Sequence, residues 1–243
     1  MSADDAAPAD DAAPASASLE AQLLLFARET GDAVRKERQT VAKLEAALAD
    51  LERSFVATTK ALALSVEARD PYTGGHLERV RAYGMGLLEE LGVAGDYPGV
   101  EIGFLLHDVG KVGVPDSILH KPGPLDQAEW VVMRTHPVIG YQFLEAIPYL
   151  RYAADIVRCH HERFDGNGYP AGLQGSEITV PARAFPVVDA FDAMTTTRPY
   201  REGMPWQRAA DELTRMAGTQ FDPDCVAAFV RLLERHHGPP PAA

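Results

Sequence analysis

The chain has 243 residues, a formal net charge of −12 at pH 7, and a hydrophobic content of 46%. This length can bury one substantial core and predicts one domain of ordinary size with an appendage. The negative charge argues against binding to nucleic-acid polymers or anionic membranes, which requires basic surfaces. Because Cys159 and Cys225 are the only cysteines, a disulfide framework is not expected and a reducing compartment is favoured.

The first 18 residues contain mainly Ala, Asp, Pro and Ser without apolar periodicity, and residues 1–18 are predicted to be a disordered acidic tail. They lack the basic and apolar segments of a secretory signal. Apolar runs elsewhere, such as AQLLLFA, are too short to cross a membrane. These features predict a soluble, cytoplasmic protein.

Residues 19–55 are predicted to form a long helix, because they contain no proline and only one glycine, Gly31. An apolar heptad stripe runs along the second half, with Lys, Arg and Glu on the other faces. Either a parallel coiled coil couples the neighbouring domain to another element, or the helix packs on its own domain. The coiled coil is preferred and predicts a homodimer through residues 19–55. The stripe consists of Val34, Val41, Leu44, Leu48, Leu51 and Phe55.

An all-α domain is predicted from residue 56 to residue 237, since helical segments follow one another without an alternating strand pattern. One helix should begin after the capping residue Asp126, and Pro137 should bend or interrupt it. Residues 238–243 are predicted to be a disordered tail. The expected helices cover residues 54–70, 75–92, 99–113, 126–147, 149–164, 182–196, 205–218 and 222–237.

Five of the eight histidines lie at or near the end of a predicted helix or at a break in one. Two aspartates accompany them. Asp108 directly follows a histidine, and Asp189 lies in an apolar run, where a buried carboxylate is costly unless it is paired or binds a metal. His120, His236 and His237 are not expected to form a site. The five histidines of interest are His76, His107, His136, His160 and His161.

Taken singly, each of these residues is more often structural than a ligand, so the prediction depends on the set. Five imidazoles and two carboxylates without a thiolate are typical of sites for Fe, Mn, Zn or Ni, and not of a structural zinc finger. Asp108 suits a bridging role, because its two oxygens can bind two ions. Seven donors exceed the needs of one ion, so two ions are predicted.

Long motifs follow one another through residues 56–236. They are ARDPYTGGHLERV, LLHDVGKVGVPDSILHKPGPL, MRTHPVIGYQ, HHERFDGNGYPAGL, VVDAFDAMTTTRPYR and GTQFDPD. Together these motifs resemble the HD-GYP domain family, a subgroup of the HD metal-dependent phosphohydrolases. The resemblance is specific because several long motifs agree in sequence and spacing. It implies an HD-domain helical bundle with an HD-GYP extension, preceded by the long N-terminal helix.

The resemblance also implies an activity, the hydrolysis of the bacterial second messenger cyclic di-GMP to pGpG, to GMP or to both. Hydroxide bridging two divalent ions, Fe and/or Mn, would attack the phosphodiester. Relatives with a third ion carry a glutamate where this chain has Tyr72, so two ions are expected. By position, the implied ligands are His76, His107, Asp108, His136, His160, His161 and Asp189.

Other positions are implied to serve the substrate. Asp108 and Lys111 are the candidate catalytic residues, with Lys111 also contacting phosphate. Arg198 and Arg201 lie where relatives place basic substrate contacts, and the arginine fork suits phosphate. Asp192 either orients a ligand histidine or lies on a helix face without a role.

The turn DGNGYP follows the adjacent histidines. Gly166 and Gly168 allow positive φ, and Pro170 is expected to fix the exit of the turn. Tyr169 is expected either to line the guanine side of the substrate opening or to contact signalling partner proteins at this turn.

The adjacent pair His160 and His161 is expected to bind one ion, with Asp108 and His136 completing its shell and the other ligands serving the second ion. Two alternatives remain open: a catalytically weak cyclic-dinucleotide sensor that signals through the coiled coil, or a hydrolase of another cyclic dinucleotide. The intact ligand set argues against the sensor. The sequence does not select the base, because the ions and Lys111 recognise phosphate.

Overall fold

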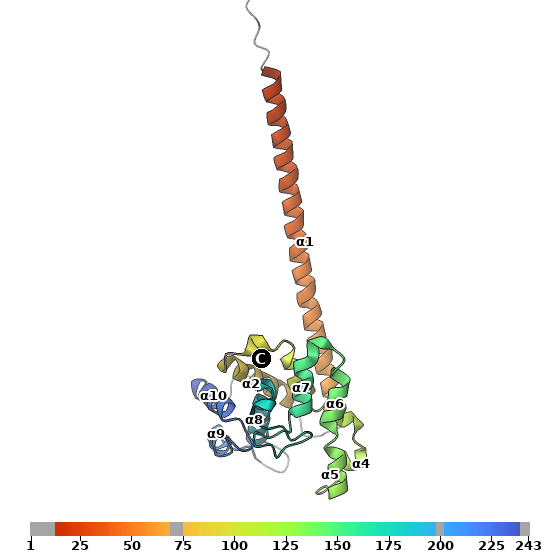
Figure 1. Cartoon of the computed structure of the whole chain (residues 1–243), viewed down its shortest axis with the longest axis vertical. Helices are drawn as coiled ribbons and strands as arrows, with labels where there is room; N and C mark the ends of the chain where they lie inside the picture. Colours follow the sequence, from red (N-terminus) through yellow and green to blue (C-terminus); the bar gives the residue numbers. More distant parts are fainter. Residues whose placement is uncertain (1–12, 69–74, 198–201, 239–243) are drawn as a thin grey trace, which may run out of the picture. The chain divides into compact units, whose positions relative to one another are not determined.

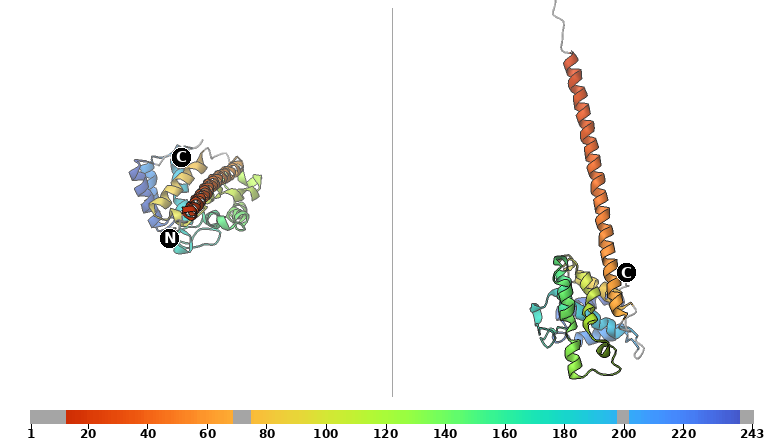
Figure 2. Two further views of the ribbon diagram at one scale, coloured as in Figure 1. Left: turned by 90° about the horizontal axis from the view of Figure 1, so that it is seen from above. Right: turned by 90° about the vertical axis from the view of Figure 1, so that its right-hand side faces the viewer.

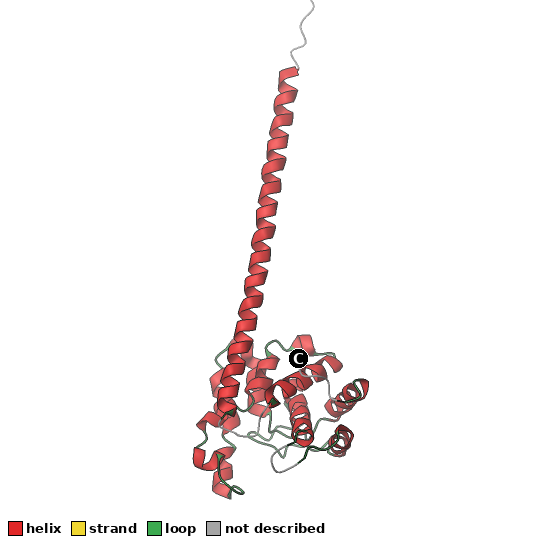
Figure 3. Ribbon diagram, turned by 180° about the vertical axis from the view of Figure 1, so that it is seen from behind, coloured by secondary structure: helices red, strands yellow, loops and turns green. Residues whose placement is uncertain are grey.

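The computed structural model describes residues 13–68, 75–197 and 202–238. The chain divides into two compact units, residues 1–55 and residues 56–243. Helices and loops make up the described residues, which contain two isolated β-bridges and no strand (Figure 3). The all-α prediction is therefore confirmed for this part of the chain. Within it, no helix combines the length and apolarity needed to span a bilayer.

Helix α1 (Ala13–Glu67) begins six residues before the predicted start at residue 19. Pro14 is compatible with this earlier start, because a proline is tolerated in the first turn of a helix. Residues 13–18 are thus helical where a disordered tail was predicted, and residues 1–12 lie outside the described residues. The apolar stripe of the first unit is exposed, with Leu44 61% and Leu51 66% accessible.

The last turns of α1 belong to the second unit. Ala63 is buried in a small core cluster with Leu77, and Lys60 Nζ lies 2.5 Å from Glu78 Oε1. These contacts attach residues 56–67 to the helix that follows.

The second unit is a bundle of short helices (Figure 1). Figures 1 and 2 show α9 and α10 side by side within it. Its α-helices are α2 (His76–Glu90), α3 (Val100–Leu106), α4 (Asp116–Leu119), α5 (Gln127–Met133), α6 (His136–Leu144), α7 (Arg151–Cys159), α8 (Val180–Thr195), α9 (Trp206–Arg215) and α10 (Pro223–Arg235). The 3₁₀ helices are η1 (Ala94–Asp96), η2 (Val109–Gly113), η3 (Pro148–Leu150) and η4 (Gly175–Glu177).

Two predicted helices are broken, and each break lies at a histidine. The Asp126 side chain accepts a 3.0 Å hydrogen bond from the Glu129 N–H, which caps α5 as predicted. Pro137 then lies in the first turn of the separate helix α6, so the predicted interruption is confirmed. The predicted helix 99–113 divides into α3 and η2 around His107 and Asp108.

Aromatic packing connects α3 to α8 and α8 to α10. Phe104 of α3 stacks on Phe185 of α8 with ring centroids 5.8 Å apart, and Phe191 meets Phe229 of α10 edge to face at 5.1 Å. All four rings are fully buried. Burying such rings stabilises the fold by roughly 1.5–3 kcal/mol each and fixes α3 against α8.

Helix α6 lies unusually close to η2. A Cβ built on Gly110 would lie 1.9 Å from the His136 carbonyl oxygen and 2.6 Å from the Gly140 nitrogen. Because both atoms belong to the backbone, no side-chain movement can relieve such a clash. Glycine at position 110 therefore sets the distance between Asp108 and His136.

Replacing Gly110 with alanine should separate η2 from α6. We expect Gly110→Ala to lower the free energy of unfolding by about 1–3 kcal/mol or more, as overpacking does. Chemical denaturation of the purified protein measures this change. Gly95→Ala is the matched control, because its Cβ would meet nothing within 4 Å. Equal stability of the two variants would contradict the close approach.

Candidate metal centre

The seven residues implied as metal ligands gather at helix ends. His107 and His160 cap the C-termini of α3 and α7, and His136 opens α6. The seven side chains form two groups, in each of which one ligand atom per residue lies within 4.8 Å of the others. The first group is Asp108, His136, His160 and His161, and the second is His76, His107 and Asp189. This is the division that the sequence analysis made.

Three of the imidazoles are oriented by the same hydrogen bond. Each donates its Nδ1–H to the backbone carbonyl three residues earlier, in the last turn of α3, α5 or α7. These carbonyls have no partner within their own helix. Because a carbonyl only accepts, Nδ1 carries a proton, which leaves Nε2 as the ring nitrogen that can bind a metal. The bonds are His107 to Phe104 (3.0 Å), His136 to Met133 (2.7 Å) and His160 to Val157 (2.8 Å).

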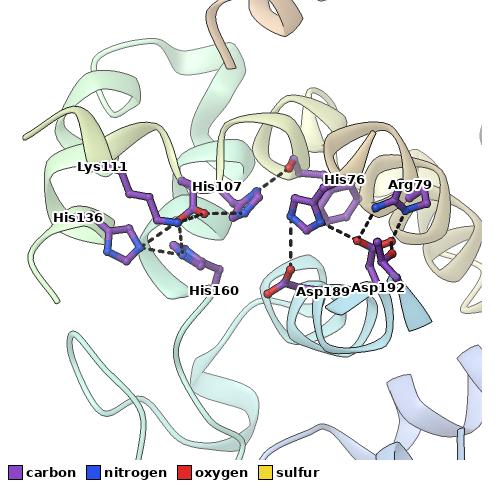
Figure 4. Close-up of polar contacts among 11 residues, drawn as sticks. His76, Arg79, His107, Lys111, His136, His160, Asp189 and Asp192 are labelled. Atoms are coloured by element: carbon purple, nitrogen blue, oxygen red, sulfur yellow. Dashed lines mark hydrogen bonds and ion pairs between the residues drawn. The ribbon is translucent and has the colours of Figure 1, made fainter. Parts of the chain in front are cut away.

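His76 is oriented by a buried carboxylate instead. Its Nδ1 lies 2.8 Å from Asp192 Oδ2, and Asp192 also accepts hydrogen bonds from the Arg79 guanidinium at 2.5 and 3.1 Å. Burial raises the Asp192 pKa, but the hydrogen bonds from His76 and Arg79 outweigh it and hold that pKa below its usual value. The other ring nitrogen of His76 faces Asp189 Oδ1 at 3.6 Å (Figure 4).

The donor atoms of the first group fit a cation. His136 Nε2 and His160 Nε2 are 3.2 Å apart, and each ring already donates through its Nδ1, so the two Nε2 atoms face each other (Figure 4). Burial holds the pKa of His160 well below its usual value, and burial with the charge of His136 lowers that of His161 to about 3. Two ring nitrogens that face each other at this distance require a proton or a metal ion between them. Neutral imidazoles beside a carboxylate are the donors that a divalent metal requires.

Asp108 lies between the two groups. Its Oδ1 is 3.3 Å from His136 Nε2, whereas its Oδ2 is 3.2 Å from His107 Nε2 and 2.8 Å from Lys111 Nζ. Burial raises its pKa, but the charges of His107 and Lys111 outweigh burial and hold the pKa well below the usual range. Each oxygen of this ionised carboxylate therefore faces a different group.

The pKa of His107 shifts in the opposite direction to that of Asp108. Burial lowers its pKa, but the charge and hydrogen bond of Asp108 outweigh burial and raise it. A metal ion competes with this proton for the ring nitrogen.

The turn after the adjacent histidines folds back over them. The Tyr169 ring stacks on His161 with centroids 4.7 Å apart and planes 24° apart, and its N–H donates to the His161 carbonyl at 3.2 Å. Burial first, and then the Asp108 charge, raises the pKa of Tyr169 to about 12. The phenol is therefore neutral, and its face covers a metal-group imidazole.

Glycine is needed at two positions of the turn for different physical reasons. Gly166 has φ +79° and uses the conformational freedom of glycine. Gly168 does not adopt positive φ. A Cβ at Gly168 would lie 2.4 Å from the Arg163 nitrogen and 2.5 Å from the Glu162 Cα. The constraint is steric, because the turn packs directly on the backbone that follows the histidine pair.

Glu162 holds this turn, and the sequence analysis did not single it out. The side chain is 3% exposed and accepts backbone hydrogen bonds from Ala171 (2.7 Å), Gly172 (3.1 Å) and Leu173 (3.2 Å). Three successive amides satisfy a buried charge that would otherwise be costly. In the sequence, an acidic residue placed between a histidine pair and a glycine-rich turn could have indicated this role.

Several predicted residues are not placed. Arg198, Arg201 and Tyr72 lie outside the described residues. Lys111 lies beside Asp108, and Asp192 contacts His76.

The role of Glu162 can be tested with Glu162→Gln. The amide nitrogen of glutamine cannot accept, so at least one of the three backbone N–H groups loses its partner. We expect hydrogen exchange at residues 171–173 to accelerate, and stability to fall by roughly 1–3 kcal/mol. Exchange measured by NMR or mass spectrometry checks this. Glu177→Gln is the control, since Glu177 accepts a single backbone N–H, from Gln174. Unchanged protection at 171–173 would contradict the clamp.

Comparison with known proteins gives consistent results. A model of the HD domain matches residues 60–225. The cyclic di-GMP phosphodiesterase response regulator RpfG of Xanthomonas campestris pv. campestris is 37% identical over 212 residues, which are 86% of this chain and 56% of that protein. The 3′3′-cGAMP-specific phosphodiesterase 3 of Vibrio cholerae is 39% identical over 169 residues, covering 69% of this chain and 37% of the relative.

A crystal structure of a cyclic GMP-AMP-specific phosphodiesterase of V. cholerae aligns with a TM-score of 0.55 and 16% identity, covering 74% of this chain and 49% of the other. At that identity the likeness supports the fold alone. The chain spans between about a third and somewhat over half of the length of these relatives.

Proposed function

The chain belongs to the HD domain family, and we propose that it is a metal-dependent phosphodiesterase that hydrolyses cyclic di-GMP to pGpG, to GMP or to both. The observation that carries the proposal is the position of Asp108, with one carboxylate oxygen facing each group of imidazoles. A shared carboxylate between two donor groups suits a pair of ions that act on one phosphodiester. Relatives named as cyclic di-GMP phosphodiesterases support the substrate class.

The two groups are proposed to hold one divalent ion each, Fe and/or Mn. Asp108, His136, His160 and His161 would hold one ion, and His76, His107 and Asp189, together with Asp108, the other. When bound, such ions would supply Lewis-acid catalysis and lower the pKa of water near the phosphodiester. Nitrogen and oxygen donors without thiolate favour these metals over a structural zinc site.

The chain's own residues would orient the ligands and bind phosphate. The three carbonyl-bonded imidazoles and the Asp192–His76 hydrogen bond fix the direction of each ring, as partners behind metal ligands do. Lys111 lies 2.8 Å from Asp108 and is proposed to contact a phosphate oxygen. Arg198 and Arg201 are proposed as further phosphate contacts.

A second substrate has one observation in its favour. The V. cholerae relative at 39% identity is named as specific for 3′3′-cGAMP. The mixed dinucleotide is therefore the first competitor to assay. The sensor alternative, a weakly catalytic protein that signals through α1, has no comparable support, because both donor groups are complete.

We also propose that residues 19–55 form a homodimeric coiled coil and that signalling proteins bind at the Gly-Tyr-Pro turn. The stripe from Val34 to Phe55 is exposed at every position, so the helix that carries it presents an apolar face. A second copy would bury these side chains against each other at heptad spacing.

The metal content of variants distinguishes a carboxylate that binds two ions from one that binds a single ion. We expect Asp108→Ala to weaken binding in both groups, because each loses a donor, and Asp189→Ala to lose only the ion of the second group. Loss of metal activation should remove several kcal/mol of transition-state stabilisation, or roughly a thousandfold in rate. Elemental analysis and chromatography of the cyclic di-GMP products measure the two effects.

His120→Ala is the control for these variants, because it removes an exposed imidazole outside both groups. If Asp108→Ala retained two ions per chain, the shared-carboxylate arrangement would be wrong. A wild-type protein that binds two ions and cyclic di-GMP without releasing product would favour the sensor.

The coiled coil predicts a specific change of mass. Polar substitution of Leu44, Leu48 and Leu51 should convert a dimer to a monomer, because the stripe is the proposed interface. Analytical ultracentrifugation or light scattering measures the mass. Lys43→Ala with Asp50→Ala is the matched control on another face of the same helix. A wild-type monomer at high micromolar concentration would contradict the dimer.

A further inference from the structure

Arg134 has an unusual position near the metal centre. It follows α5 directly, two residues before His136, and its side chain is exposed. Its guanidinium carbon lies 5.1 Å from the centroid of the Tyr169 ring and 5.7 Å from that of Trp130. Two aromatic faces therefore hold an exposed cation in place, which limits the side-chain entropy that binding would cost.

The contacts continue into the first metal group. Tyr169, which carries Arg134 on its ring, also stacks on His161 at 4.7 Å. Trp130, at the outer end, is 44% exposed. The series Trp130, Arg134, Tyr169 and His161 thus connects solvent to the metal group. Arg134 is one aromatic ring away from an imidazole of that group.

The N–H donors of Arg134 are not used in an ion pair. The chain has 35 acidic and 23 basic residues, yet among the described residues no carboxylate lies within ion-pair distance of this guanidinium. The contacts with the two rings are cation–π contacts, which use the charge of the guanidinium and leave its N–H donors available. The edge of the guanidinium presents paired donors for a planar acceptor.

The location of Arg134 favours contact with a base of the substrate over contact with the phosphate that reacts. Asp108 and Lys111 mark the point where the two groups meet, and Arg134 lies farther out, beyond the Tyr169 ring. A nucleotide whose phosphate lies between the two groups extends its sugar and base outward. Guanine offers N7 and O6 as adjacent acceptors for an arginine fork, whereas adenine offers N7 beside an N6 amino donor. Aromatic side chains next to such a fork suit base stacking.

We propose that Arg134, held by the faces of Tyr169 and Trp130, recognises a guanine base of the cyclic dinucleotide and so contributes to substrate selection. This inference rests on the proposed function. It assigns to α5 and the Gly-Tyr-Pro turn a shared part in reading the base.

The test compares three substrates, cyclic di-GMP, 3′3′-cGAMP and cyclic di-AMP, with the metal-loaded wild-type protein and Arg134→Ala. We expect kcat/KM for cyclic di-GMP to fall about 10- to 100-fold, the value of one bidentate base contact, and that for cyclic di-AMP to stay unchanged. The ratio between substrates is the decisive quantity, because a folding defect lowers all three rates together. Arg134→Lys should lose the same discrimination, since it keeps the charge without the fork.

Arg158→Ala is a matched control. Arg158 is also exposed and lies 5.1 Å from a tyrosine ring, that of Tyr141, which does not stack on either metal group. We expect this variant to keep the wild-type substrate ratio. An equal loss on all three substrates in Arg134→Ala would overturn the proposal and indicate a phosphate contact. No loss would overturn it as well.

Binding measurements distinguish a failure of this inference from a failure of the proposed activity. If the wild-type protein hydrolyses none of the three compounds, the phosphodiesterase proposal fails. Calorimetric affinities of the same proteins for the same compounds then still test Arg134. A guanine-dependent loss of affinity in Arg134→Ala would support base recognition, and equal affinities, or no binding by the wild type, would overturn it.

Discussion

The centre depends on one hydrogen bond that occurs three times, from an imidazole Nδ1–H to a carbonyl in the last turn of a helix. The bond satisfies a carbonyl that has no partner within its helix, and it fixes the tautomer of the ring. The remaining nitrogen, Nε2, then faces the donor groups and is the atom that can bind a metal. Because α3, α5 and α7 end near one another, the hydrogen bonds that complete these helix ends also bring the metal-binding nitrogens together.

Two carboxylates near these rings are neutralised in different ways, and the difference suits different tasks. Asp192 is 2% exposed and receives both an arginine fork and His76, which fixes its position. Asp108 is paired with Lys111, a point charge on a flexible stem. An arginine fork holds a carboxylate in one geometry, whereas a lysine can move to another oxygen. The first arrangement suits orientation of a ring, and the second suits a site that must receive a phosphate.

Local sequence signals predict much of the second unit. What they miss depends on contacts and burial that only the folded chain shows. Asp126 and Pro137 mark real helix boundaries because capping and proline geometry are local effects. The histidines could be recognised as a set because metal donors are chemically unusual in such number. Arg79 could not, because its partner Asp192 lies far away in the sequence. Glu162 was missed because a buried acid looks like a surface acid in the sequence, although its partners lie in the next turn. The steric reason for Gly168 was likewise not visible in the sequence, because it depends on how closely the turn packs on the Glu162 backbone.

Charge links metal binding to substrate binding in the proposed reaction. The chain carries a net charge of −12, and its donor groups combine two aspartates with imidazoles of which His160 and His161 are held neutral. Lys111 and His107, whose pKa Asp108 raises, offset much of the charge of the two aspartates. The protein atoms of the two groups therefore supply little net positive charge for a cyclic dinucleotide, which carries two negative phosphodiesters. Two divalent ions would make the local charge positive, because bound cations are the largest charges in such a site. On the proposed function, metal binding should therefore strengthen substrate binding as well as supply the chemistry.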